Sequence, residues 1–217
     1  MHALSRLAAL VCLGLLAWSR AVAASVDFKL VDARGHPVPD AVVSLVPLDP
    51  AAPATAASRR PVEIEQVKQE FLPYVTPVLV GTTVSFPNRD TEQHHVYSLS
   101  DAKKFEFPLY KPGMAEKVVF DRPGVVAIGC NVHDWMIAYV VVLETPLFAK
   151  SDDDGAARVA DVPPGHYRAE VWQPRLDKPA TREVTIAADS PAPLAFTLPL
   201  KRDLRIHRPV ESGGGYK

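Results

Sequence analysis

The sequence predicts an all-β protein. Its apolar stretches are short, rich in valine and separated by turn signals, and proline is frequent, with 21 residues in a chain of 217. β-Branched side chains suit strands, and the prolines and glycines between the stretches break helices. An antiparallel sandwich or barrel is therefore the expected architecture.

Residues 1–23 predict a secretory signal peptide. Arg6 precedes an apolar run from Leu7 to Trp18, and Ala21-Val22-Ala23 fits an export cleavage site. The mature chain is then expected to begin near Ala24, in the periplasm. No later stretch is long and apolar enough to cross a bilayer, so no membrane span is predicted.

The next two segments differ in composition. Residues 25–49 contain predicted strands at 26–31 and 41–46, on either side of the turn Asp32-Ala33-Arg34-Gly35-His36-Pro37. Residues 50–61 are rich in alanine and proline and show little periodicity, so a linker is expected there.

Residues 62–146 carry a dense succession of strands. Turn signals such as Val80-Gly81-Thr82 and Arg122-Pro123-Gly124 separate short apolar stretches. Strands are predicted at 62–69, 76–80, 83–87, 95–98, 116–120, 124–130 and 138–144.

Residues 147–200 return to the earlier pattern. The run Asp152-Asp153-Asp154-Gly155 lacks the alternating ligands and distal glutamate of a calcium loop, so it is interpreted as a hairpin turn. Strands are predicted at 158–162, 168–173, 183–187 and 193–198. Residues 201–217 are basic and Gly-rich and are expected to form a disordered tail.

Composition excludes several functions. The formal net charge is −1, and no basic patch or Gly-rich phosphate loop is present, so nucleic acid is not an expected partner. No Ser-His-Asp or Cys-His-Asn catalytic arrangement can be recognised in the sequence, so catalysis is not indicated.

The most informative motif is Cys130, His133 and Met136, at the spacing C-x2-H-x2-M. Removal of the signal peptide takes away Cys12 and leaves one cysteine in an oxidising compartment. Such a thiol pairs with another chain, stays buried or binds a metal. Two histidines, a cysteine and a weak axial methionine are the ligands of blue-copper electron-transfer sites. The motif therefore predicts one mononuclear copper ion and requires a second histidine.

His94 and His95 are the candidates for that histidine. They precede or begin a predicted strand, where neighbouring side chains point to opposite faces. Only one of the two can therefore face Cys130.

Two parts of the chain resemble known families. The sequences D-A-R-G-H-P-V-P-D-A-V-V and D-D-D-G followed by V-P-P-G-H-Y-R-A-E-V resemble the two ends of a carboxypeptidase-regulatory or transthyretin-like sandwich, an Ig-like class. The middle segment resembles a cupredoxin, most of all amicyanin, which shares C-x2-H-x2-M. Together they resemble the cupredoxin-domain proteins called methylamine utilisation proteins. This resemblance implies a cupredoxin Greek-key sandwich at 62–146, inserted into a transthyretin-like sandwich made of 25–49 and 147–200.

The resemblance also implies the site. In cupredoxins a loop that starts at an asparagine, here Asn88, ends in the first histidine ligand, which selects His94 over His95. The implied copper ligands are His94, Cys130, His133 and Met136. Cupredoxins usually carry asparagine after that histidine and serine or threonine after the cysteine, and these side chains tie the ligand loops together. Here the two positions are His95 and Asn131, whose hydrogen bond could replace the tie or fail to do so.

An electron exit is implied as well. The edge of His133 is expected to emerge through an apolar patch, for which Trp135, Ile137, Pro108 and Met114 are candidates. Ordinary core packing is the alternative for these side chains. The expected partner is a redox protein, such as a periplasmic dehydrogenase or a cytochrome.

Three functions remain open. The leading hypothesis is an exported type 1 copper protein that carries single electrons by outer-sphere transfer. The alternatives are copper capture or delivery, and a structural or ligand-binding sandwich with a vestigial copper site. Zinc is the competing metal, although the affinity order favours copper.

Overall fold

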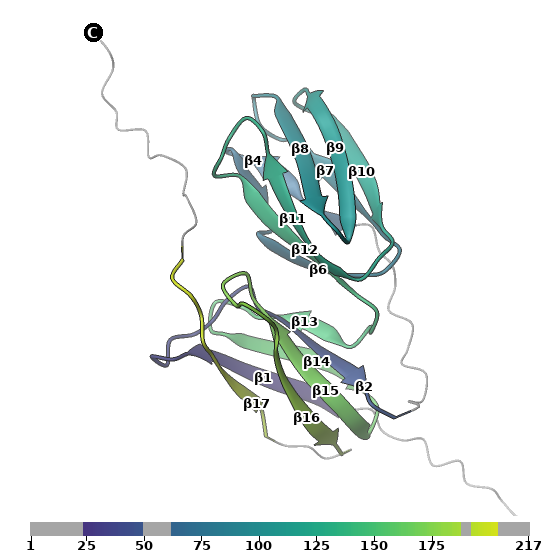
Figure 1. Cartoon of the computed structure of the whole chain (residues 1–217), viewed down its shortest axis with the longest axis vertical. Coiled ribbons are helices and arrows are strands. Elements are labelled where there is room, and N and C mark those ends of the chain that lie inside the picture. Colours follow the sequence, from purple (N-terminus) through teal and green to yellow (C-terminus); the bar gives the residue numbers. More distant parts are fainter. Residues whose placement is uncertain (1–23, 50–61, 188–191, 204–217) are drawn as a thin grey trace, which may run out of the picture.

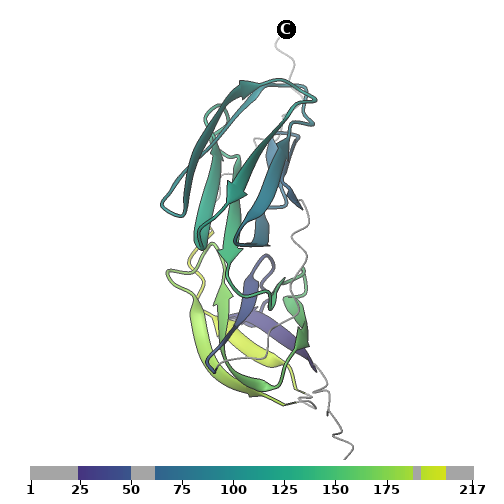
Figure 2. The ribbon, with the colours of Figure 1, turned by 90° about the vertical axis from the view of Figure 1, so that its right-hand side faces the viewer.

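The computed structural model describes residues 24–49, 62–187 and 192–203, and the regular elements in these ranges are all strands. The predicted all-β class is therefore confirmed. The strands form two β-sandwiches that follow one another along the long axis of the molecule (Figures 1 and 2). The predicted signal peptide, the linker and residues 204–217 of the tail lie outside the described residues. No helix in the described ranges is long and apolar enough to cross a membrane.

The first sandwich combines strands from both ends of the described chain. Its strands are β1 (Ala24–Asp32), β2 (Val42–Pro47), β13 (Phe148–Lys150), β14 (Ala156–Val162), β15 (Gly165–Trp172), β16 (Ala180–Ile186) and β17 (Leu194–Leu198). One sheet has the order β14-β1-β17, and the other has the order β13-β2-β15-β16. Phe28 and Leu30 of β1 pack against Leu45 and Tyr167 of the opposite sheet in a shared core.

The second sandwich is formed by the intervening residues. Its strands are β3 (Val62–Glu63), β4 (Glu65–Val67), β5 (Glu70–Leu72), β6 (Val75–Leu79), β7 (Thr82–Pro87), β8 (His94–Ser100), β9 (Lys103–Tyr110), β10 (Ala115–Phe120), β11 (Gly124–Cys130) and β12 (Ile137–Leu143). The sheets have the orders β10-β7-β3 and β6-β12-β11-β8-β9, and β4 pairs with β5. The chain crosses between the sheets from β6 to β7, from β7 to β8, from β9 to β10 and from β10 to β11, as in a Greek key.

A tight turn divides the first predicted strand of this sandwich. Lys68 and Gln69 have φ values of 54° and 58°, and the chain reverses there so that β4 pairs with β5. Two positive φ values at the centre of a hairpin are typical of a type I′ turn. The prediction of one continuous strand over 62–69 is therefore wrong. Neither glycine nor asparagine marks the turn in the sequence.

The predicted strands do not include β9, which contains Pro108. It lies at the edge of its sheet, where proline is tolerated because alternate backbone N–H positions have no neighbouring strand to bond. The pairing with β8 shifts register between Val96↔Phe107 and His94↔Tyr110. One extra residue is therefore accommodated in β9 as a bulge. Since the extra residue inverts the alternation, Tyr110 points into the core and is buried.

Strand β12 is buried on both faces. Ala138, Val140 and Val142 face the core of the second sandwich, whereas Val141 belongs to an apolar cluster with Val42 of β2. This double burial explains the continuous apolar sequence of the strand. The cluster of Val42, Val75 and Val141 joins the two sandwiches, and this contact region is called the seam.

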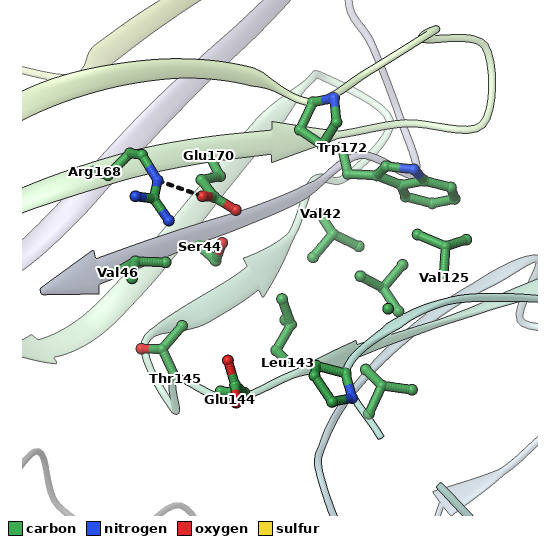
Figure 3. A pocket seen from close by; sticks show the side chains of 15 residues that line it. Val42, Ser44, Val46, Val125, Leu143, Glu144, Thr145, Arg168, Glu170 and Trp172 are labelled. Carbon is green, nitrogen blue, oxygen red and sulfur yellow. Dashed lines mark hydrogen bonds and ion pairs between the residues drawn. The ribbon is translucent and has the colours of Figure 1, made fainter. Parts of the chain in front are cut away.

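Aromatic rings and a cavity complete the seam. The ring of Tyr139 lies 5.6 Å from those of Tyr74 and Trp172. Beside them is a cavity of about 280 Å³, lined by both sandwiches (Figure 3). Arg168 and Glu170 lie on its wall and pair with each other at 2.6 Å. The two charges thus neutralise one another within the cavity.

Candidate metal centre

Three buried donor groups meet at one end of the second sandwich. Cys130 ends β11, and His94 begins the neighbouring antiparallel strand β8, so the pairing of the two strands brings them together. His133 lies in the loop that follows β11. His94, Cys130 and His133 are 0%, 5% and 8% exposed. The Sγ atom of Cys130 lies 3.8 Å from Nδ1 of His94 and 3.9 Å from Nδ1 of His133.

These distances suit a shared metal ion. A trigonal ion with bonds of about 2.3 Å to sulfur and about 2.0 Å to nitrogen holds the two kinds of ligand atom about 3.7 Å apart. All three donor atoms lie within 4.8 Å of one another. Without any rearrangement of the backbone, the cluster therefore fits a cation that favours thiolate and imidazole, such as copper or zinc.

Met136 lies in the same core cluster as Cys130 and is 2% exposed. Its backbone N–H donates a hydrogen bond of 3.0 Å to the carbonyl oxygen of His133, which closes the loop between β11 and β12. The structure thus brings all four predicted ligands to the same end of the sandwich. Their binding of a metal stays a prediction.

The surroundings of Cys130 favour its thiolate. Burial alone would raise the pKa of the thiol, but His94 and nearby backbone N–H groups outweigh burial and lower the pKa from 9.0 to about 6. One of these groups is the N–H of Val132, 3.5 Å from the sulfur. Burial alone would lower the pKa of His94, but Cys130 and Asp90 outweigh it and raise that pKa. The thiolate is the form of cysteine that binds metals.

Each of the two imidazoles has a carboxylate next to its Nε2 atom, on the side of the ring away from Cys130. Nε2 of His94 lies 2.8 Å from Oδ2 of Asp90, and Nε2 of His133 lies 3.2 Å from Oε2 of Glu92. A carboxylate only accepts hydrogen bonds, so Nε2–H of His94 donates to Asp90 and leaves Nδ1 for the sulfur side. Nε2 of His133 lies within ion-pair distance of Glu92, which favours the same orientation of that ring. Sequence reasoning missed both carboxylates. The one available signal was their place in the loop that leads to His94.

Asn88 organises that loop from inside. It is buried, and its Nδ2 donates to the carbonyl oxygens of Glu92 and Tyr110 at 2.8 and 3.2 Å. Its Oδ1 accepts a hydrogen bond of 3.0 Å from the N–H of Asp90. Asn88 therefore holds the start of the loop that leads to His94 through bonds to the backbone, and its influence on a bound metal stays a prediction.

Asn88→Ala is expected to destabilise the metal-free protein by about 2–3 kcal/mol, because buried backbone groups lose their partners. Urea denaturation followed by circular dichroism measures this change. Asn131→Ala is the matched control, because Asn131 is exposed, and its effect should stay within about 0.5 kcal/mol. Equal effects of the two substitutions would contradict the role given to Asn88.

His95 and Asn131 are linked through their backbones. The N–H of Asn131 donates to the carbonyl oxygen of His95 at 3.1 Å, which joins the two ligand loops. The imidazole of His95 pairs instead with Glu106, at 2.9 Å. The two ligand loops are thus joined through the backbone, while the side chain of His95 pairs with Glu106.

The candidates for an apolar exit patch lie in different surroundings. Trp135 is half-buried, its ring lies 5.3 Å from that of His133, and its indole N–H donates to the carbonyl oxygen of Gln69 at 3.0 Å. Trp135 and Ile137 line a depression that also includes Leu176 of the first sandwich. Pro108 and Met114 are exposed. A docking role for these residues stays a prediction.

No protein-family model matches the chain, and a search of curated proteins gives no match. Several solved structures are similar to part of it. A copper-containing nitrite reductase from Thermus scotoductus SA-01 is 29% identical over 46% of this chain, with a TM-score of 0.38, and the chain spans only 28% of that protein's length. A purple cupredoxin from Nitrosopumilus maritimus is 26% identical over 38% of this chain and 99% of its own length, with a TM-score of 0.35. A reduced Cu(I) form of an amicyanin variant is 23% identical over 46% of this chain and 98% of its own length, with a TM-score of 0.37.

The fold and the site together define an all-β protein of two sandwiches, one of which encloses a buried cluster of one thiol and two imidazoles. The solved structures that resemble part of the chain include cupredoxins.

Proposed function

We propose that this protein binds one copper ion through His94, Cys130 and His133, with Met136 as an axial ligand, and that it carries single electrons. The observation that carries the proposal is the buried cluster, in which Sγ lies 3.8 and 3.9 Å from the two Nδ1 atoms. Bound copper would supply a one-electron couple. The protein's residues supply a soft thiolate, two neutral imidazoles and a weak thioether, which suit both oxidation states.

Burial of the ligands favours electron transfer over the alternatives. The three donors and Met136 are all at most 8% exposed, so a substrate molecule has no direct approach to the ligand atoms. An outer-sphere electron carrier needs no such approach, whereas an enzyme that binds its substrate at the metal does. Copper delivery requires a metal ion that leaves its ligands readily. Burial of the donor atoms disfavours such release.

The remaining parts of the proposal rest on the sequence. Export to the periplasm follows from the signal-like segment at 1–23, and a redox protein such as a dehydrogenase or a cytochrome is the proposed partner. Kinship with the methylamine utilisation proteins follows from the two sequence resemblances. In that interpretation, residues 62–146 are a cupredoxin domain within a transthyretin-like one, and the protein is not an enzyme.

The test is a titration of the metal-free protein, residues 24–217, with Cu(II). One equivalent is expected to produce intense visible thiolate-to-copper absorption and narrow copper hyperfine splitting. A parallel titration with Zn(II), followed by competition, establishes which metal the site prefers. A protein that stays colourless at one equivalent of Cu(II) overturns the proposal.

Met136→Gln is expected to lower the reduction potential of the copper-loaded protein. The amide oxygen is a harder ligand than the thioether and therefore stabilises Cu(II) relative to Cu(I). Redox titration of the visible band measures the change. The conservative control is Met136→Leu, which removes the sulfur without adding an oxygen and should not lower the potential. If Met136→Gln left the potential unchanged, Met136 would not be an axial ligand.

A further inference from the structure

The turn between β4 and β5 contacts the metal centre, and Gln69 makes most of these contacts. Its backbone N–H donates to Oδ2 of Asp90 at 2.8 Å, and its side-chain amide donates to the two oxygens of Glu92 at 3.0 and 3.1 Å. Its carbonyl oxygen accepts the indole N–H of Trp135. Gln69 therefore joins both carboxylates that hold the imidazoles.

The carboxylates are fixed on two sides. Asp90 accepts the N–H groups of Lys68 and Gln69 as well as Nε2–H of His94. Glu92 is bound by Gln69 and faces Nε2 of His133, although about half of its side chain is exposed. The turn thus places one negative charge behind each imidazole.

A carboxylate behind an imidazole has three effects on a metal site. It fixes which ring nitrogen carries the proton, and it makes the other nitrogen a better donor. Its negative charge also stabilises the higher charge of an oxidised metal ion, most strongly where burial weakens solvent screening. The stronger donor nitrogen and the negative charge both favour Cu(II) over Cu(I).

We propose that Asp90 and Glu92, positioned by Gln69, hold the two imidazoles by Nε2 and lower the reduction potential of bound copper. This inference rests on the proposed function. The three residues are positioning residues, because they act on the metal through His94 and His133.

The chain contains a natural control for this arrangement. His95 and Glu106 form a pair of the same kind at 2.9 Å, one residue away from His94. Glu106→Gln removes a carboxylate from a histidine that is not among the proposed ligands. It leaves the hydrogen bonds of Asp90, Glu92 and Gln69 in place.

The experiment compares Glu92→Gln, Asp90→Asn, Gln69→Gly and Glu106→Gln in the full mature chain. Glycine suits the positive φ at position 69, so that substitution removes the side-chain amide without backbone strain. Glu92→Gln and Asp90→Asn are expected to raise the copper reduction potential and to weaken Zn(II) binding by about 10- to 100-fold. Gln69→Gly should shift both quantities in the same direction, and Glu106→Gln should shift neither.

A spectroscopic measurement tests the orientation of the rings directly. In the Zn(II)-loaded wild-type protein, nitrogen NMR should show protonated Nε2 and metal-bound Nδ1 for both His94 and His133. Metal-bound Nε2 on either ring would overturn the inference. So would variants of Asp90 and Glu92 whose potentials and Zn(II) affinities equal those of the Glu106→Gln control.

The two proposals fail in different ways. If the wild-type protein binds no copper, the proposed function fails. If it binds copper as proposed but substitution of Asp90 and Glu92 leaves the potential unchanged, the tuning role alone fails. Should Asp90→Asn prevent folding, the exposed residue Glu92 still provides the decisive comparison.

Discussion

Cys130→Ser is expected to abolish the intense visible absorption of the copper-loaded protein. The band requires a copper–thiolate bond, and a hydroxyl is too weakly acidic and too hard to replace the thiolate. Cys130 is the one cysteine that remains after the predicted cleavage, so no other thiol in the chain can compensate. Titration of the variant with Cu(II), followed by visible absorption and electron paramagnetic resonance, measures the loss.

The neighbouring histidines are the matched comparison. His94→Ala should remove the band, because Nδ1 of His94 lies 3.8 Å from the sulfur. His95→Ala should leave the colour, because the imidazole of His95 pairs with Glu106. If His95→Ala bleached the protein while His94→Ala did not, the register of the ligand loop assigned to this chain would be wrong.

Gly155→Ala is expected to destabilise the first sandwich by roughly 2–5 kcal/mol. Gly155 has a φ of +68°, and a Cβ there would lie 2.9 Å from the backbone nitrogen of Val38 and closer still to the carbonyl oxygen of Leu30. The cost combines the left-handed conformation, about 1–2 kcal/mol, with a clash against backbone that has no room to move, about 1–3 kcal/mol. Chemical denaturation of the metal-free protein measures it.

Gly35→Ala separates the two contributions. Gly35 also has a positive φ, +85°, but a Cβ there would meet nothing within 4 Å. Its substitution should therefore cost only about 1–2 kcal/mol, the conformational part alone. Similar losses for the two variants would show that the close approach of β1 to the turn at Gly155 is not a constraint.

Much of the second sandwich could be predicted, because its strands are short apolar runs between glycine and proline turns. The strand predicted over 124–130 coincides with β11 (Gly124–Cys130), and that predicted over 116–120 begins one residue inside β10 (Ala115–Phe120). The turn at Lys68 and Gln69 could not be predicted, since these residues carry no local preference for positive φ. Pairing with β5 and hydrogen bonds to Asp90 compensate for that conformation.

The residues of the candidate metal centre could likewise be predicted only in part. Cys130, His133 and Met136 are close in the sequence, so their spacing alone indicates a common ligand loop. The roles of Asp90 and Glu92 depend on where His133 and Gln69 lie in space, and no local pattern contains that information. The contact between Glu92 and Nε2 of His133 was missed for the same reason, because the two residues belong to different loops.

The bulge in β9 restricts the number of residues that this strand can contain. Phe107 packs against the core and Tyr110 is buried within it, three positions further on, which plain alternation in a strand would not allow. From inside the core, the Tyr110 hydroxyl donates to the carbonyl oxygen of Phe86 at 2.9 Å, and its backbone carbonyl receives a hydrogen bond from Asn88. Loss of a single residue between Phe107 and Tyr110 would turn this phenol towards solvent. Insertions and deletions are thus restricted here even though the segment runs along an open sheet edge, where changes in length are usually tolerated.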